Sequence, residues 1–248
     1  MFDPEIRRFE SIDSTNLEAI RQAKAGAAEG VCVIARTQTA GRGRLDRKWH
    51  SPKDAGLYFS VILRPKLEKN VWPLITLMAA LAVSDSIMKA CAVETDIKWP
   101  NDICANDRKI CGILAETVET HSGAAAVLGI GINLTADRLA EIPAEATAIE
   151  LVAGGQVDPE IILEQLLRSI GDGYELLQTV EGPEHIIREW CAHSSYAFDR
   201  LVSVSLEGDS FQGVTRGLES DGALRVETAD GKIKVIRAGD VTALRLLS

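Results

Sequence analysis

The chain has 248 residues, of which 46% are hydrophobic and 25% are charged, and its formal net charge is −9 at pH 7. This length and composition are typical of a soluble globular protein with one large domain, or with a large and a small one. Tight nonspecific binding to nucleic acid requires many lysines and arginines that neutralise phosphates, so the acidic balance argues against that function.

The cysteines and the N-terminal segment indicate the compartment. The five cysteines are odd in number, scattered, and without C-x-x-C spacing: Cys32, Cys91, Cys104, Cys111 and Cys191. This pattern favours reduced thiols over a disulfide framework or a zinc site. The first ten residues, "MFDPEIRRFE", contain no apolar segment of a secretory signal, and no apolar run approaches the ~20 residues of a membrane-spanning helix. The sequence therefore predicts a soluble, cytoplasmic protein without a membrane partner.

The first half of the chain alternates helices and strands. Residues 11–27 predict a helix capped by Asp13 or Ser14 and stopped at Gly26. The runs 30–37 and 56–65 are rich in apolar and β-branched residues and predict buried strands. Residues 72–92 carry an apolar helical stripe with a proline in the first turn, so they predict a core helix.

The second half predicts more strands, then helices, then a change of texture. Strands joined by tight Asn/Asp turns are expected at 96–102, 102–106, 108–119 and 124–134, and helices at 158–178 and 182–193. After about residue 195, short strands recur every eight to twelve residues between Gly-Asp and Asp-Gly turns, which is typical of a small β-barrel or sandwich. A boundary near Tyr196 therefore divides a larger α+β domain, 1–195, from a compact all-β domain, 196–248.

A basic loop, "TQTAGRGRLDRKW" (37–49), follows the first buried strand. Arg42 and Arg44 alternate with glycines that let the backbone open and close. Arginine suits phosphate and carboxylate because its planar fork donates two parallel hydrogen bonds. We favour anion binding over an unliganded solvated loop by about two to one on this pattern. Binding to a DNA minor groove is a weaker alternative.

The segment "VLGIGINL" separates its residues onto two faces if it is a strand. One face is aliphatic, and it carries Leu128, Ile130, Ile132 and Leu134. The other face has few side-chain atoms, and it carries Val127, Gly129, Gly131 and Asn133. The second face suits the close approach of a flat ligand, or tight packing against another part of the chain, with nearly equal weight. Its glycine spacing is not that of a G-x-G-x-x-G phosphate loop.

The segment "KWPNDICANDRKICGIL" presents Lys98, Asn101, Asp102 and Lys109 around a predicted hairpin. Counting in steps of two along the strand places Lys109 on the same face as Cys111 and Ile113. Considered alone, Lys109 is an ordinary strand-end lysine and Asp102 an ordinary turn residue. The four histidines show no metal-ligand spacing, and no nucleophile pattern is present. Together with the basic loop and the glycine face, these residues suit an anionic small molecule and a phosphoryl or acyl-phosphate group.

Five segments, in this order, resemble the motifs of the biotin protein ligases. They are "SIDSTN" (11–16), "TQTAGRGRLDRKW" (37–49), "KWPNDI" (98–103), "RKICGIL" (108–114) and "GIGINL" (129–134). The β-rich tail with "GVTRGLESDGAL" (213–224) is similar to the family's C-terminal SH3-like domain. The resemblance thus covers essentially the whole chain. It implies an α+β fold, with a class II synthetase-like catalytic domain of a mixed sheet flanked by helices, followed by a small SH3-like β-barrel.

The resemblance implies a ligase that makes biotinyl-5′-AMP and pyrophosphate from biotin and ATP with Mg²⁺. The enzyme then transfers biotin to a lysine of a biotin carboxyl carrier protein, such as that of acetyl-CoA carboxylase. Both reactants are anions, so cations are needed to offset their repulsion and the charge that develops at the α-phosphorus. A loop that folds over the water-sensitive mixed anhydride can exclude water until the acceptor arrives.

The resemblance also implies roles for individual positions. The positions that match biotin contacts are Ser14, Thr15, Asn16, Gln38, Arg42, Gly112, Gly129 and Gly131. The positions that match nucleotide contacts are Arg44, Trp49, Asn101, Asp102, Lys109 and Asn133. Lys109 is expected to be the main electrostatic catalyst, with Arg42 and Arg44 as further catalytic cations and Asp102 also a candidate partner for the acceptor lysine. The Mg²⁺ ligands are left unassigned.

This sequence departs from the family's pattern at one loop position. The family's loop usually reads G-R-G-R-x-G-R, and the sixth position here is Asp46. Aspartate tolerates left-handed backbone better than most residues, so the turn is expected to survive. Its negative charge beside the arginines is expected to loosen retention of the adenylate.

Three rival functions are disfavoured. A lipoate–protein ligase shares the fold and the adenylate chemistry but lacks the "GRGR" loop, and a noncatalytic binder would lack Arg44 or Lys109. A DNA-binding regulator is disfavoured by the net charge. It is also disfavoured because the chain begins almost at "SIDSTN", which leaves no room for the helix-turn-helix of some relatives. No DNA partner is therefore expected, whereas a homodimer through an edge of the central sheet is compatible with the resemblance.

Overall fold

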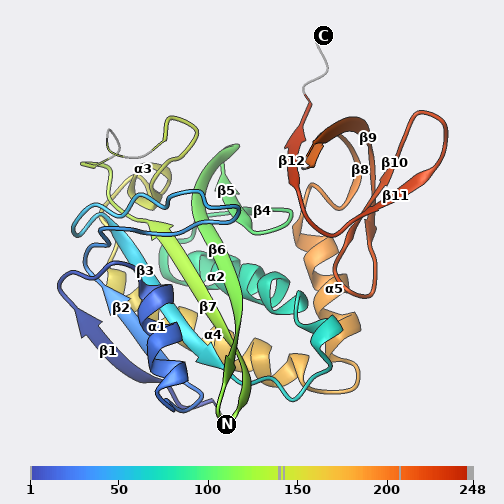
Figure 1. Ribbon diagram of the computed structural model, residues 1–248. Coiled ribbons are helices and arrows are strands. Elements are labelled where there is room, and N and C mark those ends of the chain that lie inside the picture. Colours follow the sequence, from blue (N-terminus) through green and yellow to red (C-terminus); the bar gives the residue numbers. More distant parts are fainter. Residues whose placement is uncertain (1, 139–140, 142, 207, 245–248) are drawn as a thin grey trace.

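The chain folds around two β-sheets (Figure 1). The computed structural model describes residues 2–138, 141, 143–206 and 208–244. In these residues, a seven-stranded sheet has the strand order β1-β2-β3-β7-β6-β5-β4. Its strands are β1 (Glu5–Phe9), β2 (Val31–Ala35), β3 (Gly56–Leu63), β4 (Asp96–Lys98), β5 (Asp102–Ala105), β6 (Arg108–Thr120) and β7 (Gly123–Asn133). The sheet is mixed, since β1 pairs with β2 in parallel and the other pairs are antiparallel.

Helices cover both faces of this sheet. They are α1 (Thr15–Lys24), α2 (Leu74–Cys91), α3 (Ile149–Ala153), α4 (Pro159–Leu177) and α5 (Gly182–His193), with the 3₁₀ turn η1 (Lys69–Val71) before α2. Helix α1 packs on one face against β2, β3 and β7, while α2 and α4 pack together on the opposite face (Figure 1). Helix α5 packs against α2 and leads into the second sheet. The predicted helices and strands of residues 30–193 are confirmed in type and approximate position.

The second sheet is five-stranded and antiparallel among the described residues, with the order β11-β10-β9-β8-β12. Its strands are β8 (Phe198–Leu206), β9 (Asp209–Leu218), β10 (Leu224–Glu227), β11 (Ile233–Ile236) and β12 (Asp240–Ala243). This confirms a small all-β part after the mixed sheet, and with it the α+β class. The division at Tyr196 stays a prediction, and residues 245–248 of that predicted domain lie outside the described residues.

The two faces of β7 are as the sequence predicts. Leu128, Ile130 and Ile132 are buried in the main core with α2 and α4. Val127 belongs to a smaller cluster with Ala19 and other residues of the α1 side. The glycines and Asn133 share the α1 side with Val127, so the sparse face of β7 opens beneath the N-terminus of α1.

Among the described helices, α2 alone has the length and the apolar composition that a membrane-spanning helix needs. Its apolar window is 56% buried inside the protein. Leu74, Met78 and Ile87 are among its buried residues, and α4 and α5 cover it. Its hydrophobicity is accounted for by the core, as the sequence predicts.

The N-terminal region contains one confirmed helix and one strand that the sequence analysis did not predict. Ser14 occupies the N-cap of α1, the helix ends at Lys24, and Gly26 has φ +94°. Strand β1 was not predicted because its sequence, "EIRRF", is mostly charged. Such a strand is stable at a sheet edge, where one side of the backbone and most side chains meet solvent.

Helix α3, far from the N-terminus, was also missed by the sequence analysis, because its five residues are too few to show helical periodicity.

Candidate functional site

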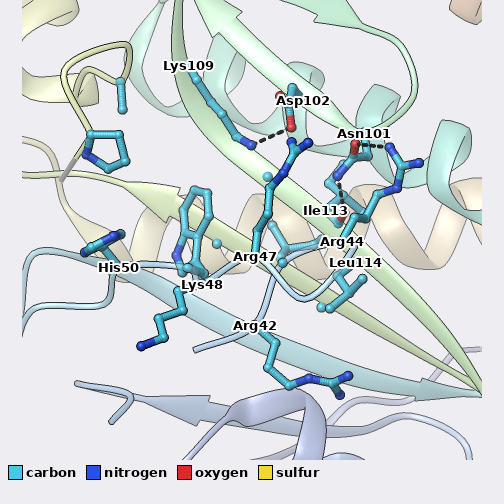
Figure 2. Close-up of a pocket in the computed structure, with 18 of the residues that line it drawn as sticks. Arg42, Arg44, Arg47, Lys48, His50, Asn101, Asp102, Lys109, Ile113 and Leu114 are labelled. Carbon is cyan, nitrogen blue, oxygen red and sulfur yellow. Dashed lines mark hydrogen bonds and ion pairs between the residues drawn. The ribbon is translucent and has the colours of Figure 1, made fainter. Parts of the chain in front are cut away.

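One cavity of about 480 Å³ opens on the α1 side of the mixed sheet (Figure 2). Six parts of the chain line it: the N-terminus of α1, the basic loop, the β4–β5 region, strands β6 and β7, the segment with Pro143, Glu145 and Ala146, and strand β12 of the second sheet. All predicted site residues line this cavity, namely Ser14, Thr15, Asn16, Gln38, Arg42, Arg44, Trp49, Asn101, Asp102, Lys109, Gly112, Gly129, Gly131 and Asn133. The fold therefore gathers residues that lie up to 119 positions apart.

The basic loop is a small hairpin. Arg42 and Lys48 form an antiparallel bridge, the Gly43 amide donates to the Arg47 carbonyl (2.7 Å), and the Arg47 amide donates to the Arg44 carbonyl (3.1 Å). The two turn residues, Leu45 and Asp46, have φ values of +52° and +58°. Positive φ at both central positions is the type I′ geometry that joins antiparallel strands. Asp46 therefore occupies a left-handed position, as expected of a residue that replaces glycine.

The hairpin presents Arg44 and Arg47 to different neighbours. Arg44 Nη1 donates to Asn101 Oδ1 (3.1 Å), and Asn101 Nδ2 donates to the Ile113 carbonyl (2.7 Å) (Figure 2). Arg47 forms an ion pair with Asp240 of β12. Burial lowers the pKa of Arg44, whereas the hydrogen bond to Asp240 raises the pKa of Arg47. Both guanidinium groups remain cationic at neutral pH, because arginine stays protonated throughout the physiological pH range.

Lys109 points into the cavity, and its predicted face is wrong. The β5–β6 register pairs Ile103 with Cys111 and then Cys104 with Lys109, so one extra residue stands in β6. Such a β-bulge changes which face the next side chain occupies. Lys109 consequently lies on the face of β6 opposite Cys111, on the same side as Gly112. A Cβ added to Gly112 would come within 3.3 Å of Lys109 Nζ.

Two further contacts hold the Lys109 ammonium. Its Nζ is 2.6 Å from Asp102 Oδ1 (Figure 2). The same Nζ lies 5.4 Å from the centroid of the Trp49 ring. The lysine and aspartate side chains are 32% and 23% exposed, so the pair is partly shielded from water. A cation held at the side of a half-buried cavity is well placed to attract an anionic reactant.

The glycine face accommodates the indole of Trp49. A Cβ on Gly131 would lie 2.5 Å from Trp49 Nε1, and one on Gly112 would lie 2.9 Å from its Cζ3. The Trp49 Nε1 atom is buried and has no hydrogen-bond partner among the described residues. Of the two explanations for this sparse face, close packing of a side chain is the one observed at Gly131. The unpaired N–H marks a place where a bound acceptor atom would be favourable.

The N-terminal motif residues lie at the other end of the cavity. Ser14, Thr15 and Asn16 are all buried, and the Thr15 amide donates to Gln38 Oε1 (2.8 Å). Asn133 is also buried, and its Nδ2 donates to the Thr147 carbonyl (3.2 Å), which fixes the segment after β7 against the cavity. Polar groups therefore line both ends of a cavity whose middle is formed by glycines and an indole.

Arg42 lines the cavity but is separated from the other cations. Its Nη1 donates to both carboxylate oxygens of Glu116, at 2.9 and 3.0 Å. Figure 2 shows Arg42 directed away from Lys109. The structure therefore brings Arg44 and Lys109 to one end of the cavity, whereas Arg42 belongs to the end with Asn16.

Several lining residues were not predicted from the sequence. Among them are Arg47, Lys48, His50, Glu145 and residues 240–242. Arg47 and Lys48 lie inside a recognised motif and could have been selected by charge. Asp240 carries no local signal, because its place at the cavity depends on how the second sheet packs. Among the described residues, no group of three His, Cys, Asp or Glu side chains is arranged to hold a metal ion.

Two family models match the chain. The model of the biotin/lipoate A/B protein ligase family matches residues 8–133, and that of the biotin protein ligase C-terminal domain matches residues 198–242. The second match coincides with the five-stranded sheet, which begins at Phe198.

The chain is similar to named ligases over most of its length. It is 36% identical to the bifunctional ligase/repressor BirA of Bacillus subtilis, over 93% of this chain and 71% of that protein. It is 33% identical to the biotin–[acetyl-CoA-carboxylase] ligase of Mycobacterium tuberculosis, over 94% and 86% of the two chains. The biotin protein ligase of Aquifex aeolicus in complex with biotin and ATP superposes with a TM-score of 0.82 at 28% identity, covering 98% of this chain and 99% of that one. The chain belongs to the biotin protein ligase family.

Proposed function

We propose that this protein activates biotin with ATP to biotinyl-5′-AMP and pyrophosphate, and then transfers biotin to a lysine of a biotin carboxyl carrier protein. The observation that supports this most is the single cavity that unites every residue matching the family's biotin and nucleotide motifs. Solved relatives contain biotin with ATP, or biotinyl-5′-AMP, in structures that cover at least 95% of this chain.

In the first step, an oxygen of the biotin carboxylate attacks the α-phosphorus of ATP, and the bond to the leaving pyrophosphate breaks. Negative charge gathers around the α-phosphoryl group as the two anions meet. The Lys109 ammonium, held by Asp102 at 2.6 Å, and the Arg44 guanidinium, held by Asn101 at 3.1 Å, offset this charge at one end of the cavity. Because both cations are oriented before the ligand arrives, little reorganisation accompanies the reaction.

Biotin occupies the other end of the cavity in this proposal. Ser14, Thr15, Asn16, Gln38 and Arg42 gather there, with the glycines of β6 and β7 forming the wall between the two ends. The nucleotide lies toward Trp49, Asn101 and Asn133. Arg42 contributes on the biotin side, since Glu116 holds its guanidinium there.

In the second step, the amine of the carrier lysine attacks the acyl carbon of the mixed anhydride, and AMP leaves. The attacking amine must first lose a proton. Asp102 lines the cavity and is the candidate partner for that lysine, and Lys109 is the cation that stays with the leaving phosphate. The basic hairpin excludes water from the anhydride while the carrier approaches.

Mg²⁺ would be held in this site together with the phosphates of ATP. Among the described residues there is no cluster of three candidate metal ligands. Mg²⁺ usually keeps several waters and is bound by one or two carboxylates together with substrate phosphates, so such a cluster is not required. Asp102 is a cavity carboxylate that can supply such a ligand, and the ion would add positive charge beside the phosphates.

The carrier protein, the compartment and the assembly are also part of the proposal. A biotin carboxyl carrier domain of acetyl-CoA carboxylase or a related carboxylase is the acceptor, and the cytoplasm is the compartment. DNA binding is not expected, given the net charge of −9. A homodimer can form through an edge of the mixed sheet, and β1 and β4 are the edge strands of that sheet in the described residues.

Biotin-dependent exchange between ATP and pyrophosphate tests the proposed function directly. The wild-type protein should catalyse exchange with biotin but not with lipoate or octanoate. Lys109→Ala should reduce the exchange rate by about 10²-fold or more, because it removes a preorganised cation at the reacting centre. Exchange with lipoate instead would assign the chain to the lipoate–protein ligases. No exchange with any of the three acids would refute the proposed ligase activity.

A further inference from the structure

Glu116 connects two parts of the biotin end of the cavity. It lies on β6 and does not line the cavity. Its carboxylate accepts hydrogen bonds from Asn16 Nδ2 (2.9 Å) and from Arg42 Nη1 (2.9 and 3.0 Å). Both of these side chains do line the cavity. A single carboxylate therefore holds one residue of α1 and one residue of the basic loop.

The side chain of Asn16 occupies the space that Gly129 leaves free by having no side chain. Gly129 lies beneath it on β7, where an added Cβ would come within 1.9 Å of Asn16 Oδ1. Ser60 on β3 is paired in register with Gly129 and is fully buried. Its hydroxyl oxygen lies 2.6 Å from Asn16 Oδ1 and 2.8 Å from Thr15 Oγ1. The oxygen end of the amide is therefore fixed by a donor from the sheet.

Glu116 fixes the nitrogen end of the same amide. Asn16 Nδ2 has two hydrogens, and its acceptors are the Leu114 carbonyl (3.2 Å) and the Glu116 carboxylate (2.9 Å). The reversed amide would turn its oxygen toward these two acceptors and would lose both hydrogen bonds. Glu116, together with the Leu114 carbonyl, thus determines which end of the Asn16 amide faces each side of the biotin site.

Arg42 adds charge to the same arrangement. The Glu116 side chain is 22% exposed and that of Arg42 is 36% exposed, so the ion pair is partly shielded from water. Hydrogen bonds between charged groups are about twice as strong as neutral ones. Without Glu116, Arg42 would lose the partner that directs it away from Lys109, and Asn16 would lose the acceptor that orients it.

We propose that Glu116 is a positioning residue for biotin, which orients the Asn16 amide and the Arg42 guanidinium from behind the cavity. This inference rests on the proposed function, because the ligand it concerns is biotin. Glu116 acts through its two partners rather than by contact with the ligand, so it affects biotin affinity more than the binding of ATP.

Isothermal titration calorimetry of biotin binding tests this proposal without requiring activity. Glu116→Gln preserves the shape but removes the charge, and the biotin Kd should rise by about 10- to 100-fold, the range for hydrogen bonds to charged groups. The matched control is Glu119→Gln on the same strand, whose carboxylate is 70% exposed and pairs with Lys69 outside the cavity. Its biotin Kd should not change. Glu116→Asp, which keeps the charge on a shorter side chain, should have an intermediate Kd.

A double-mutant cycle separates positioning from a general structural effect. In a chain that carries Asn16→Ala, Glu116→Gln should raise the biotin Kd by a smaller factor, because one of the positioned side chains is absent. The KM for ATP should stay unchanged in Glu116→Gln. Equal factors in both backgrounds, or an unchanged Kd in Glu116→Gln, would overturn the inference about Glu116. If the wild type does not bind biotin, the proposed function itself fails.

Discussion

The glycines of β7 show how the absence of a side chain can serve binding. Gly129 and Gly131 do not need positive φ, since they lie in a regular strand. Their value lies in the space above them, which Asn16 and Trp49 occupy at distances that a Cβ would not permit. The sequence indicated a flat face but could not indicate which side chains would cover it, because both come from segments about 80 or more residues earlier in the chain.

Gly129→Ala should therefore weaken biotin binding while the protein stays folded. The new methyl group would lie 1.9 Å from Asn16 Oδ1, so the amide must leave its bonds to Ser60 and Glu116. We expect the biotin Kd to rise by at least about tenfold, corresponding to one or more lost hydrogen bonds. Calorimetry should be compared with Gly155→Ala, because an added Cβ at Gly155 meets nothing within 4 Å. Equal affinities in the two variants would contradict this explanation.

At the scale of elements, the hairpin and the bulge decide where the cations lie. The sequence predicted a mobile loop with two arginines, and the structure shows a hairpin with a defined two-residue turn. It predicted Lys109 on the wrong face, since strict alternation fails wherever a strand contains one extra residue. Periodicity predicts regular strands well, and it predicts least at irregular positions such as this bulge, where the functional side chain is placed.

Asp46 provides a test of the hairpin. Asp46→Asn keeps a residue that tolerates left-handed backbone and removes the negative charge beside the arginines. It should slow the dissociation of biotinyl-5′-AMP by a few-fold, as expected for an exposed charge worth up to about 1 kcal/mol. Asp46→Val should speed dissociation, because a β-branched residue is strained at φ +58°. Release of labelled adenylate at low and high salt measures both effects. If the slower release of the Asp46→Asn variant persisted at high salt, the electrostatic cause would be contradicted.

At the scale of the whole molecule, the second sheet completes the site. Residues 240–242 of β12 line the cavity, Asp240 pairs with Arg47, and the Gly239 carbonyl lies 3.5 Å from the Arg44 guanidinium nitrogens. Helical caps, strand faces and turn residues made most elements predictable from local sequence. This contact was not predictable, because Arg47 and Asp240 are 193 residues apart and neither carries a signal for the other.

Asp240→Asn should consequently loosen the basic hairpin from a distance. The ion pair is partly exposed, at 61% and 37% for the two side chains, so its loss should cost no more than about 1 kcal/mol. That cost predicts a rise of about two- to fivefold in the dissociation rate of the adenylate and in the KM for ATP. Asp230→Asn is the control, since that exposed carboxylate pairs with Lys232 in the turn between β10 and β11, away from the cavity.

The partner residue makes the test decisive. Arg47→Gln should reproduce the effect of Asp240→Asn, and the double variant should be no worse than either single one, because both substitutions break the same ion pair. Additive effects would mean that the two side chains act independently of each other. If Asp230→Asn speeds adenylate release as much as Asp240→Asn does, the cause is the charge of the second sheet as a whole. If only the Arg47–Asp240 pair matters, the second sheet regulates how long the hairpin stays closed over the adenylate.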